Sequence, residues 1–79
     1  SKIENFYSAK EIIDCLIEED EENFGWLNEH KSKGHWIGNE LRKSGIVKGK
    51  AEQKKIDGIN VKGYYLDLEL IKQKLSAYS

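Results

Sequence analysis

The stretch that decides the fold is residues 34–65, GHWIGNELRKSGIVKGKAEQKKIDGINVKGYY. Apolar side chains recur at helical spacing up to Leu41, and Gly45 follows where a left-handed residue commonly ends a helix. Ile46, beyond this glycine, can contact Leu41, which is the apolar contact of a Schellman motif. The first part of the stretch therefore predicts a helix that ends sharply at Gly45.

The second part of the same stretch predicts a β-hairpin. Asp57 and Gly58 lie between β-compatible residues, and an Asp-Gly pair in that setting is the strongest short-range signal for a hairpin turn. Gly63 in the second strand indicates a bulge or the close approach of another backbone. Residues 47–53, which join helix and hairpin, leave two alternatives open: a short second helix of a helix-turn-helix, or a direct path into the first strand.

Helices are expected on both sides of this unit. Ser8 and Glu11 have the spacing of a capping box, and the apolar stripe behind them predicts a helix over about residues 8–20. Residues 23–28 allow two alternatives, a turn of helix or a third strand that pairs with the hairpin. We favour the strand, which would place Phe24 and Trp26 on one face. A last helix is expected to be capped by Asp67, with an apolar stripe at 3-4-3 spacing formed by Leu68, Ile71, Leu75 and Tyr78.

Length and composition limit the class of protein. The 79 residues are 38% hydrophobic and 34% charged and contain no proline, which predicts a single folded domain, residues 1–79, with a small core. No apolar run approaches the ~18–20 residues of a membrane span, and no signal peptide opens the chain, so we expect a cytoplasmic protein with no membrane partner. Cys15, the single cysteine, is expected to be buried as a small hydrophobic residue.

The net charge of −1 conceals a strong asymmetry along the chain. Residues 1–30 carry nine acidic side chains against two lysines, whereas residues 31–62 carry nine basic side chains against three acidic ones. Such a chain should present one face that attracts polyanions and one that repels them, and an ordinary solvated lysine-rich surface is the alternative that charge alone leaves open. The acidic run from Glu18 to Glu22 is expected to be a solvated, fraying end of the first helix, because carboxylates oppose the helix dipole there.

We expect no catalytic site, no metal site and no cofactor. The chain has no phosphate-binding loop motif, and Cys15 has no histidine at a helical spacing that would activate it. His30 and His35 lack a third soft ligand for zinc; His30 is expected in an exposed loop and His35 near a helix start, with a phosphate contact as its alternative role. Trp26 and Trp36 are expected to be buried, and stacking on exposed bases is the alternative.

The chain has, in order, a capped helix, a tryptophan-containing loop, IGNELRKSGI, a basic hairpin and VKGYYLD. In this order of its parts it resembles the winged-helix module at the C-terminal end of replicative helicases of phages, plasmids and mobile elements. SAKEIIDCLIEED and the stretch from IGNELRKSGI to VKGYYLD are similar to replication initiators of staphylococcal cassettes and pathogenicity islands. The resemblance covers Phe6 to about Tyr78, but residues 47–53 depart from it, because a standard recognition helix would be longer there.

This resemblance implies an α+β fold, a winged helix made of a helix-turn-helix, a small antiparallel β-hairpin wing and a C-terminal helix. It also implies that the chain is the C-terminal fragment of a larger replication helicase, in which an ATPase domain unwinds DNA and other domains form a ring. The terminal module of such proteins is implicated in recognising origin DNA, so double-stranded origin repeats are the expected partner.

Charge and resemblance together predict where DNA is contacted. The main contact segment is predicted to be Lys48, Lys50, Gln53, Lys54 and Lys55. The wing is predicted to contribute Asn60 and Lys62, and the flank that contacts phosphates is predicted to be Lys31, Lys33, Arg42 and Lys43. Gln53 and Asn60 are the candidates for base contacts, because amides can pair with adenine in the major groove. The alternative function is a protein–protein docking module, in which the acidic first helix engages a basic partner and DNA is not contacted.

Overall fold

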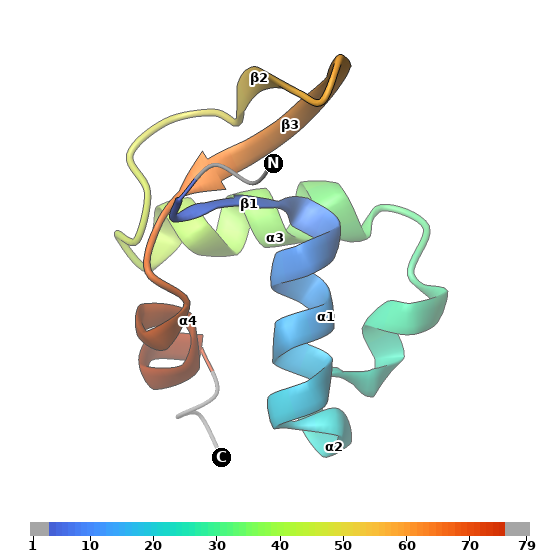
Figure 1. The fold of residues 1–79 in the computed structure, drawn as a ribbon. Helices are drawn as coiled ribbons and strands as arrows, with labels where there is room; N and C mark the ends of the chain where they lie inside the picture. The colour runs from blue at the N-terminus through green and yellow to red at the C-terminus, as the bar shows by residue number, and fades with distance from the viewer. Residues whose placement is uncertain (1–3, 76–79) are drawn as a thin grey trace.

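A computed structural model describes residues 4–75, which form a small α+β arrangement of helices on one side of a three-stranded antiparallel sheet (Figure 1). The elements in chain order are β1 (Phe6–Ser8), α1 (Ala9–Glu19), α2 (Glu21–Phe24), the 3-10 helix η1 (Gly25–Glu29), α3 (Lys33–Lys43), β2 (Glu52–Ile56), β3 (Ile59–Tyr65) and α4 (Leu68–Leu75). None of the helices within residues 4–75 has the length and apolar character needed to cross a membrane.

The sheet has the order β1-β3-β2, so β3 lies in the middle. β2 and β3 form the predicted hairpin, with Ile56 opposite Ile59 across a two-residue turn. Both turn residues have positive φ, 50° at Asp57 and 81° at Gly58, as the mirror-image hairpin turns require. The Asp-Gly prediction is confirmed, and the pairing continues without a bulge as far as Gly63.

The third strand comes from a different part of the chain than predicted. β1, which precedes the first helix, pairs with β3 and sets Phe6 opposite Tyr65 and Ser8 opposite Gly63. Gly63 is indeed a close-approach point, because a Cβ there would collide with the carbonyl of Tyr7. The favoured prediction that residues 23–28 form a strand is wrong, and the alternative, a turn of helix, is correct, since they lie in α2 and η1.

Capping by Asp20 explains why that segment is helical. One Asp20 carboxylate oxygen accepts from the backbone N–H of Asn23 at 3.2 Å and the other from its side-chain amide at 2.8 Å, so a new helix begins there. Glu21 and Glu22 then occupy a helix N-terminus, where the dipole favours carboxylates. The acidic run therefore starts a second helix, and the expectation of a frayed end was wrong.

The local signals at the other helix ends are confirmed. In α1 the Ser8 hydroxyl accepts from the Glu11 N–H at 3.2 Å, and the Glu11 carboxylate accepts from the Ser8 N–H at 3.1 Å. In α4 the Asp67 carboxylate accepts from the Glu69 N–H at 2.9 Å. Tyr78, expected to continue the apolar face of α4, lies outside the described residues. The helices and the sheet bury one core: Ile12, Ile13, Leu16, Leu27, Ile37, Leu41, Tyr64, Leu66, Ile71 and Leu75.

A Schellman motif ends α3, as the sequence predicts. Gly45 has a φ of +80°, the Ile46 N–H donates to the Leu41 carbonyl at 3.1 Å, and the Gly45 N–H donates to the Arg42 carbonyl at 3.1 Å. After this stop, residues 47–51 form neither a helix nor a strand, and β2 begins at Glu52. Of the two alternatives for residues 47–53, the second helix is therefore absent.

Three side chains are less buried than expected. Trp26 is 50% exposed, although its indole N–H donates to the Asn23 carbonyl at 2.8 Å and its ring meets Trp36 edge-on at 5.3 Å. Trp36 and Cys15 are half-buried. His30, expected to face solvent, is half-buried beside the Trp26 ring, with 5.4 Å between ring centroids. Trp26 therefore lies at the surface in η1, and Trp36 of α3 packs against it at the edge of the core.

Candidate nucleic-acid interface

The register of the β2–β3 hairpin sorts its polar side chains onto two faces. Gln53 lies opposite Lys62 and Lys55 opposite Asn60, and successive residues of a strand point to opposite faces, so these four share one face. Tyr64, two residues after Lys62, shares it too and is only 8% exposed, because its side chain packs toward the helices. We call Gln53, Lys55, Asn60 and Lys62 the inner face of the hairpin, since it is turned toward α3.

Lys54 lies on the other face. Its Nζ is 5.6 Å from the centre of the Tyr65 ring and 3.7 Å from the carboxylate of Glu52. The cation is therefore already partnered, and it points away from α3. The structure thus separates Lys54 from Lys55, although both were predicted to belong to a single contact segment.

A hollow lies between α3 and the hairpin, with a volume of about 630 Å³. We call it the α3–hairpin hollow; it is lined by Ala9, Gly34, His35, Gly38, Arg42, Lys50, Ala51, Lys62 and Tyr64. Four of these side chains, His35, Arg42, Lys50 and Lys62, are cationic or can become so, and all four are exposed. The hollow therefore gathers basic groups from α3, from the following loop and from β3, and no carboxylate of the described chain lines it.

The basic side chains of this surface have no carboxylate partner within residues 4–75. Among residues 4–75, the ion pairs are made by other lysines, for example Lys43 with Glu40 at 3.6 Å, and by none of Arg42, Lys50, Lys55 and Lys62. Uncompensated charges that line a concave surface focus the electrostatic field toward it. The arrangement can attract an anion or a polyanion into the hollow.

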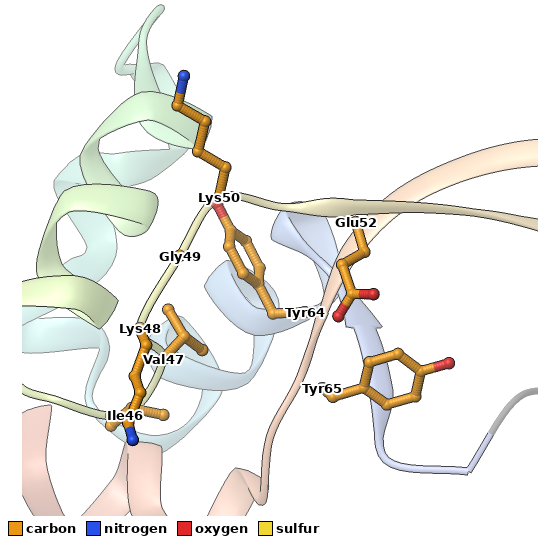
Figure 2. Close-up of a pocket in the computed structure, with 8 residues that line it drawn as sticks. All are labelled: Ile46, Val47, Lys48, Gly49, Lys50, Glu52, Tyr64 and Tyr65. Carbon is orange, nitrogen blue, oxygen red and sulfur yellow. The ribbon is translucent and has the colours of Figure 1, made fainter.

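The two lysines of the loop after α3 point in different directions. Figure 2 shows the side chains of Lys48 and Lys50 pointing in opposite directions, with Lys50 beside the Tyr64 hydroxyl. Only Lys50 of the pair lines the α3–hairpin hollow. Of the remaining predicted residues, Lys31 is exposed in the turn before α3 and Lys33 is half-buried at the first position of α3.

Gly38 sets the distance between α3 and the hairpin, and the sequence analysis did not single it out. A Cβ at this position would lie 2.9 Å from the Tyr64 hydroxyl and within 3.7 Å of both terminal nitrogens of Arg42. The missing side chain therefore lets Tyr64 and the Arg42 guanidinium approach the helix from two sides. A glycine inside a helix costs about 1 kcal/mol relative to alanine, so it usually has a packing reason, and that was the available signal.

A second groove, along α1, is lined by acidic side chains. Glu11, Asp14 and Glu18 of α1 line this groove with Tyr7, Cys15 and Leu68. Burial raises the pKa of the Cys15 thiol, and the nearby carboxylates of Glu19, Glu18 and Glu69 raise it further against the opposing effect of Lys72. Within residues 4–75 no three His, Cys, Asp or Glu side chains are grouped in a way that could hold a metal ion.

No family model, no curated protein and no solved structure matches the chain. The geometry and charge of the α3–hairpin surface therefore carry the functional proposal that follows.

Proposed function

We propose that the chain is a winged-helix module that binds double-stranded DNA, with α3 as the recognition helix and the β2–β3 hairpin as the wing. The observation that carries this proposal is the α3–hairpin hollow, where Arg42, Lys50 and Lys62 converge with no acidic partner among the described residues. The major groove of B-DNA admits an α-helix, and the flanking cations would then contact phosphates.

The distribution of charge supports an oriented approach to DNA. The exposed carboxylates of α1 and α2 lie on elements that contribute none of the charged residues of the hollow. DNA would therefore be drawn to one side of the domain and repelled by another. In this arrangement residues 47–51 act as the connection between recognition helix and wing, which removes the need for a second helix after Gly45.

The biological role we propose is recognition of origin repeats by the terminal module of a mobile-element replication helicase. It rests on the resemblance of the stretches from SAKEIIDCLIEED to VKGYYLD described above. The module itself binds and does not catalyse, and unwinding belongs to the ATPase domain of the parent chain.

A salt titration of duplex binding tests this function. If Arg42, Lys50, Lys55 and Lys62 each neutralise one phosphate, the slope of log affinity against log salt should be about −3.6, from roughly −0.9 per contact. The titration is done by fluorescence anisotropy with a labelled duplex at several salt concentrations. An affinity that does not change with salt would contradict the proposal.

Two neighbouring lysines provide a matched pair of variants. Lys55→Glu places a negative charge on the inner face of the hairpin, whereas Lys54→Glu places it on the outer face beside Tyr65. We expect the first variant to weaken duplex binding much more than the second, with both remaining folded. The alternative function, protein–protein docking through the acidic helix α1, predicts that the wild-type chain does not bind DNA. A wild-type chain that fails to bind any duplex would therefore favour docking.

A further inference from the structure

Asn39 lies on α3 beside the α3–hairpin hollow, between two residues that line it. It is exposed, and it lies four residues after His35 and three before Arg42, both of which line the hollow. Residues three and four apart on a helix are surface neighbours, so these three side chains share one face. Under the proposed function this is the face that enters the groove.

Arg42 fixes the orientation of the Asn39 side chain. The Nη2 of Arg42 donates to the Oδ1 of Asn39 at 2.8 Å. Because a guanidinium has donors and no acceptor, the amide oxygen and not the amide nitrogen must face it. The guanidinium itself lies against the helix at Gly38, where the missing Cβ leaves space for it.

The Asn39 amide still has hydrogen-bond donors and an acceptor lone pair that can pair with a base. Within the described residues its Nδ2 makes no hydrogen bond, and its Oδ1 accepts only the one from Arg42, which leaves two donors and a second lone pair. Adenine presents an acceptor, N7, beside a donor, N6–H₂, in the major groove, and an asparagine amide pairs with both at once. A side chain already held in one orientation loses less entropy when it binds.

We propose that Asn39 is the residue that reads an adenine in the major groove, and that Arg42 is its positioning residue. This inference rests on the proposed function and adds which base the module recognises. It also assigns base contacts to α3, whereas the sequence analysis assigned them to the hairpin. Gln53 and Asn60, the amides predicted from the sequence, lie on the inner face of the hairpin, and no hydrogen bond to another described residue fixes either amide.

Selection from a randomised duplex library, with the wild-type chain and with Asn39→Ala, is the first part of the test. We expect the wild type to enrich sites with an adenine at one defined position, and Asn39→Ala to lose that preference. The expected discrimination is roughly 5- to 150-fold in affinity, as for one bidentate base contact. Because Asn39 is exposed and alanine favours helix, the variant should remain folded, which circular dichroism checks.

The second part of the test changes one atom of the DNA base. Replacing the selected adenine by 7-deazaadenine exchanges its N7 nitrogen for a C–H group, so the acceptor is lost while the ring is kept. This change should weaken duplex binding by the wild type and leave duplex binding by Asn39→Ala unchanged. Arg42→Lys keeps the charge but loses the planar fork, so the preference for adenine should fall while the salt dependence stays the same. A purely structural role of Arg42 would lower affinity for all duplexes equally.

The outcomes separate this inference from the proposed function. If Asn39→Ala keeps the wild-type preference, or if the wild type binds duplexes without enriching any sequence, base reading by Asn39 is overturned and DNA binding stands. If the wild type binds no duplex in the library, the proposed function fails, and the inference fails with it.

Discussion

Gly63 is the position where the described fold is most sensitive to a single added methyl group. β3 passes so close to β1 here that a Cβ would lie 2.9 Å from the carbonyl carbon of Tyr7 and 3.0 Å from the ring of Phe6. Neither neighbour is the free end of a flexible chain, since one is backbone and the other is a side chain that is only 2% exposed. In Gly63→Ala, therefore, β1 has to move away from β3.

The size of the effect follows from what that movement exposes. Freeing Phe6 from its buried position costs about 1.5–3 kcal/mol, and each strand hydrogen bond that is lost adds about 0.5–1.5 kcal/mol. We expect Gly63→Ala to lower the free energy of unfolding by about 2–4 kcal/mol. A domain of this length has a total of roughly 4–12 kcal/mol, so the loss is a large fraction of its stability.

Urea unfolding followed by circular dichroism measures this change. With a denaturant dependence of about 1 kcal/mol per molar urea, the midpoint should fall by about 2–4 M. Gly34→Ala is the matched control, because a Cβ at Gly34 meets nothing within 4 Å and the residue lies in α3. Its stability should be unchanged or higher by up to about 1 kcal/mol. A Gly63→Ala variant as stable as wild type would refute the pairing of β1 with β3.

Three further predictions follow from individual residues. Gly45→Ala forces a side chain into a φ of +80° and should lower stability by about 1–2 kcal/mol in thermal unfolding; an unchanged midpoint would contradict the Schellman geometry. Lys50→Gln should reduce the salt slope of DNA binding by about 0.9 and Lys48→Gln by clearly less, whereas equal reductions would contradict their opposite placement. Because burial and nearby carboxylates raise the pKa of Cys15, less of it is thiolate in mildly alkaline buffer, so iodoacetamide should alkylate it more slowly in the folded chain than in urea; equal rates would count against this environment.

Local chemistry allowed much of the fold to be predicted from the sequence. The capping box at Ser8, the stop at Gly45 and the turn at Asp57 each depend on residues within a few positions of one another. β1 was missed because a strand of three residues is too short to show a period, and its partner β3 is more than fifty residues away. The start of α2 was missed because the Asp20 cap lies inside a run of acidic residues.

The candidate site was predictable in composition but not in arrangement. The charge pattern pointed to the right region, yet the register of the hairpin decides that Lys55 faces α3 and Lys54 faces Tyr65. The pair formed by Asn39 and Arg42 has no compositional signal, because it depends on one rotamer packed against Gly38. The first feature depends on how the strands pair, and the second on a side-chain conformation within α3, and neither can be read from composition.

The most direct test of DNA binding through the α3–hairpin surface is a two-dimensional NMR titration of the isotopically labelled chain with a duplex. We predict that the perturbed amide signals belong to the exposed face of α3, to residues 48–51 and to the inner face of the hairpin, and that the signals of α1, α2 and α4 stay in place. Perturbations concentrated on α1 and α2, or none at saturating duplex, would contradict the proposal.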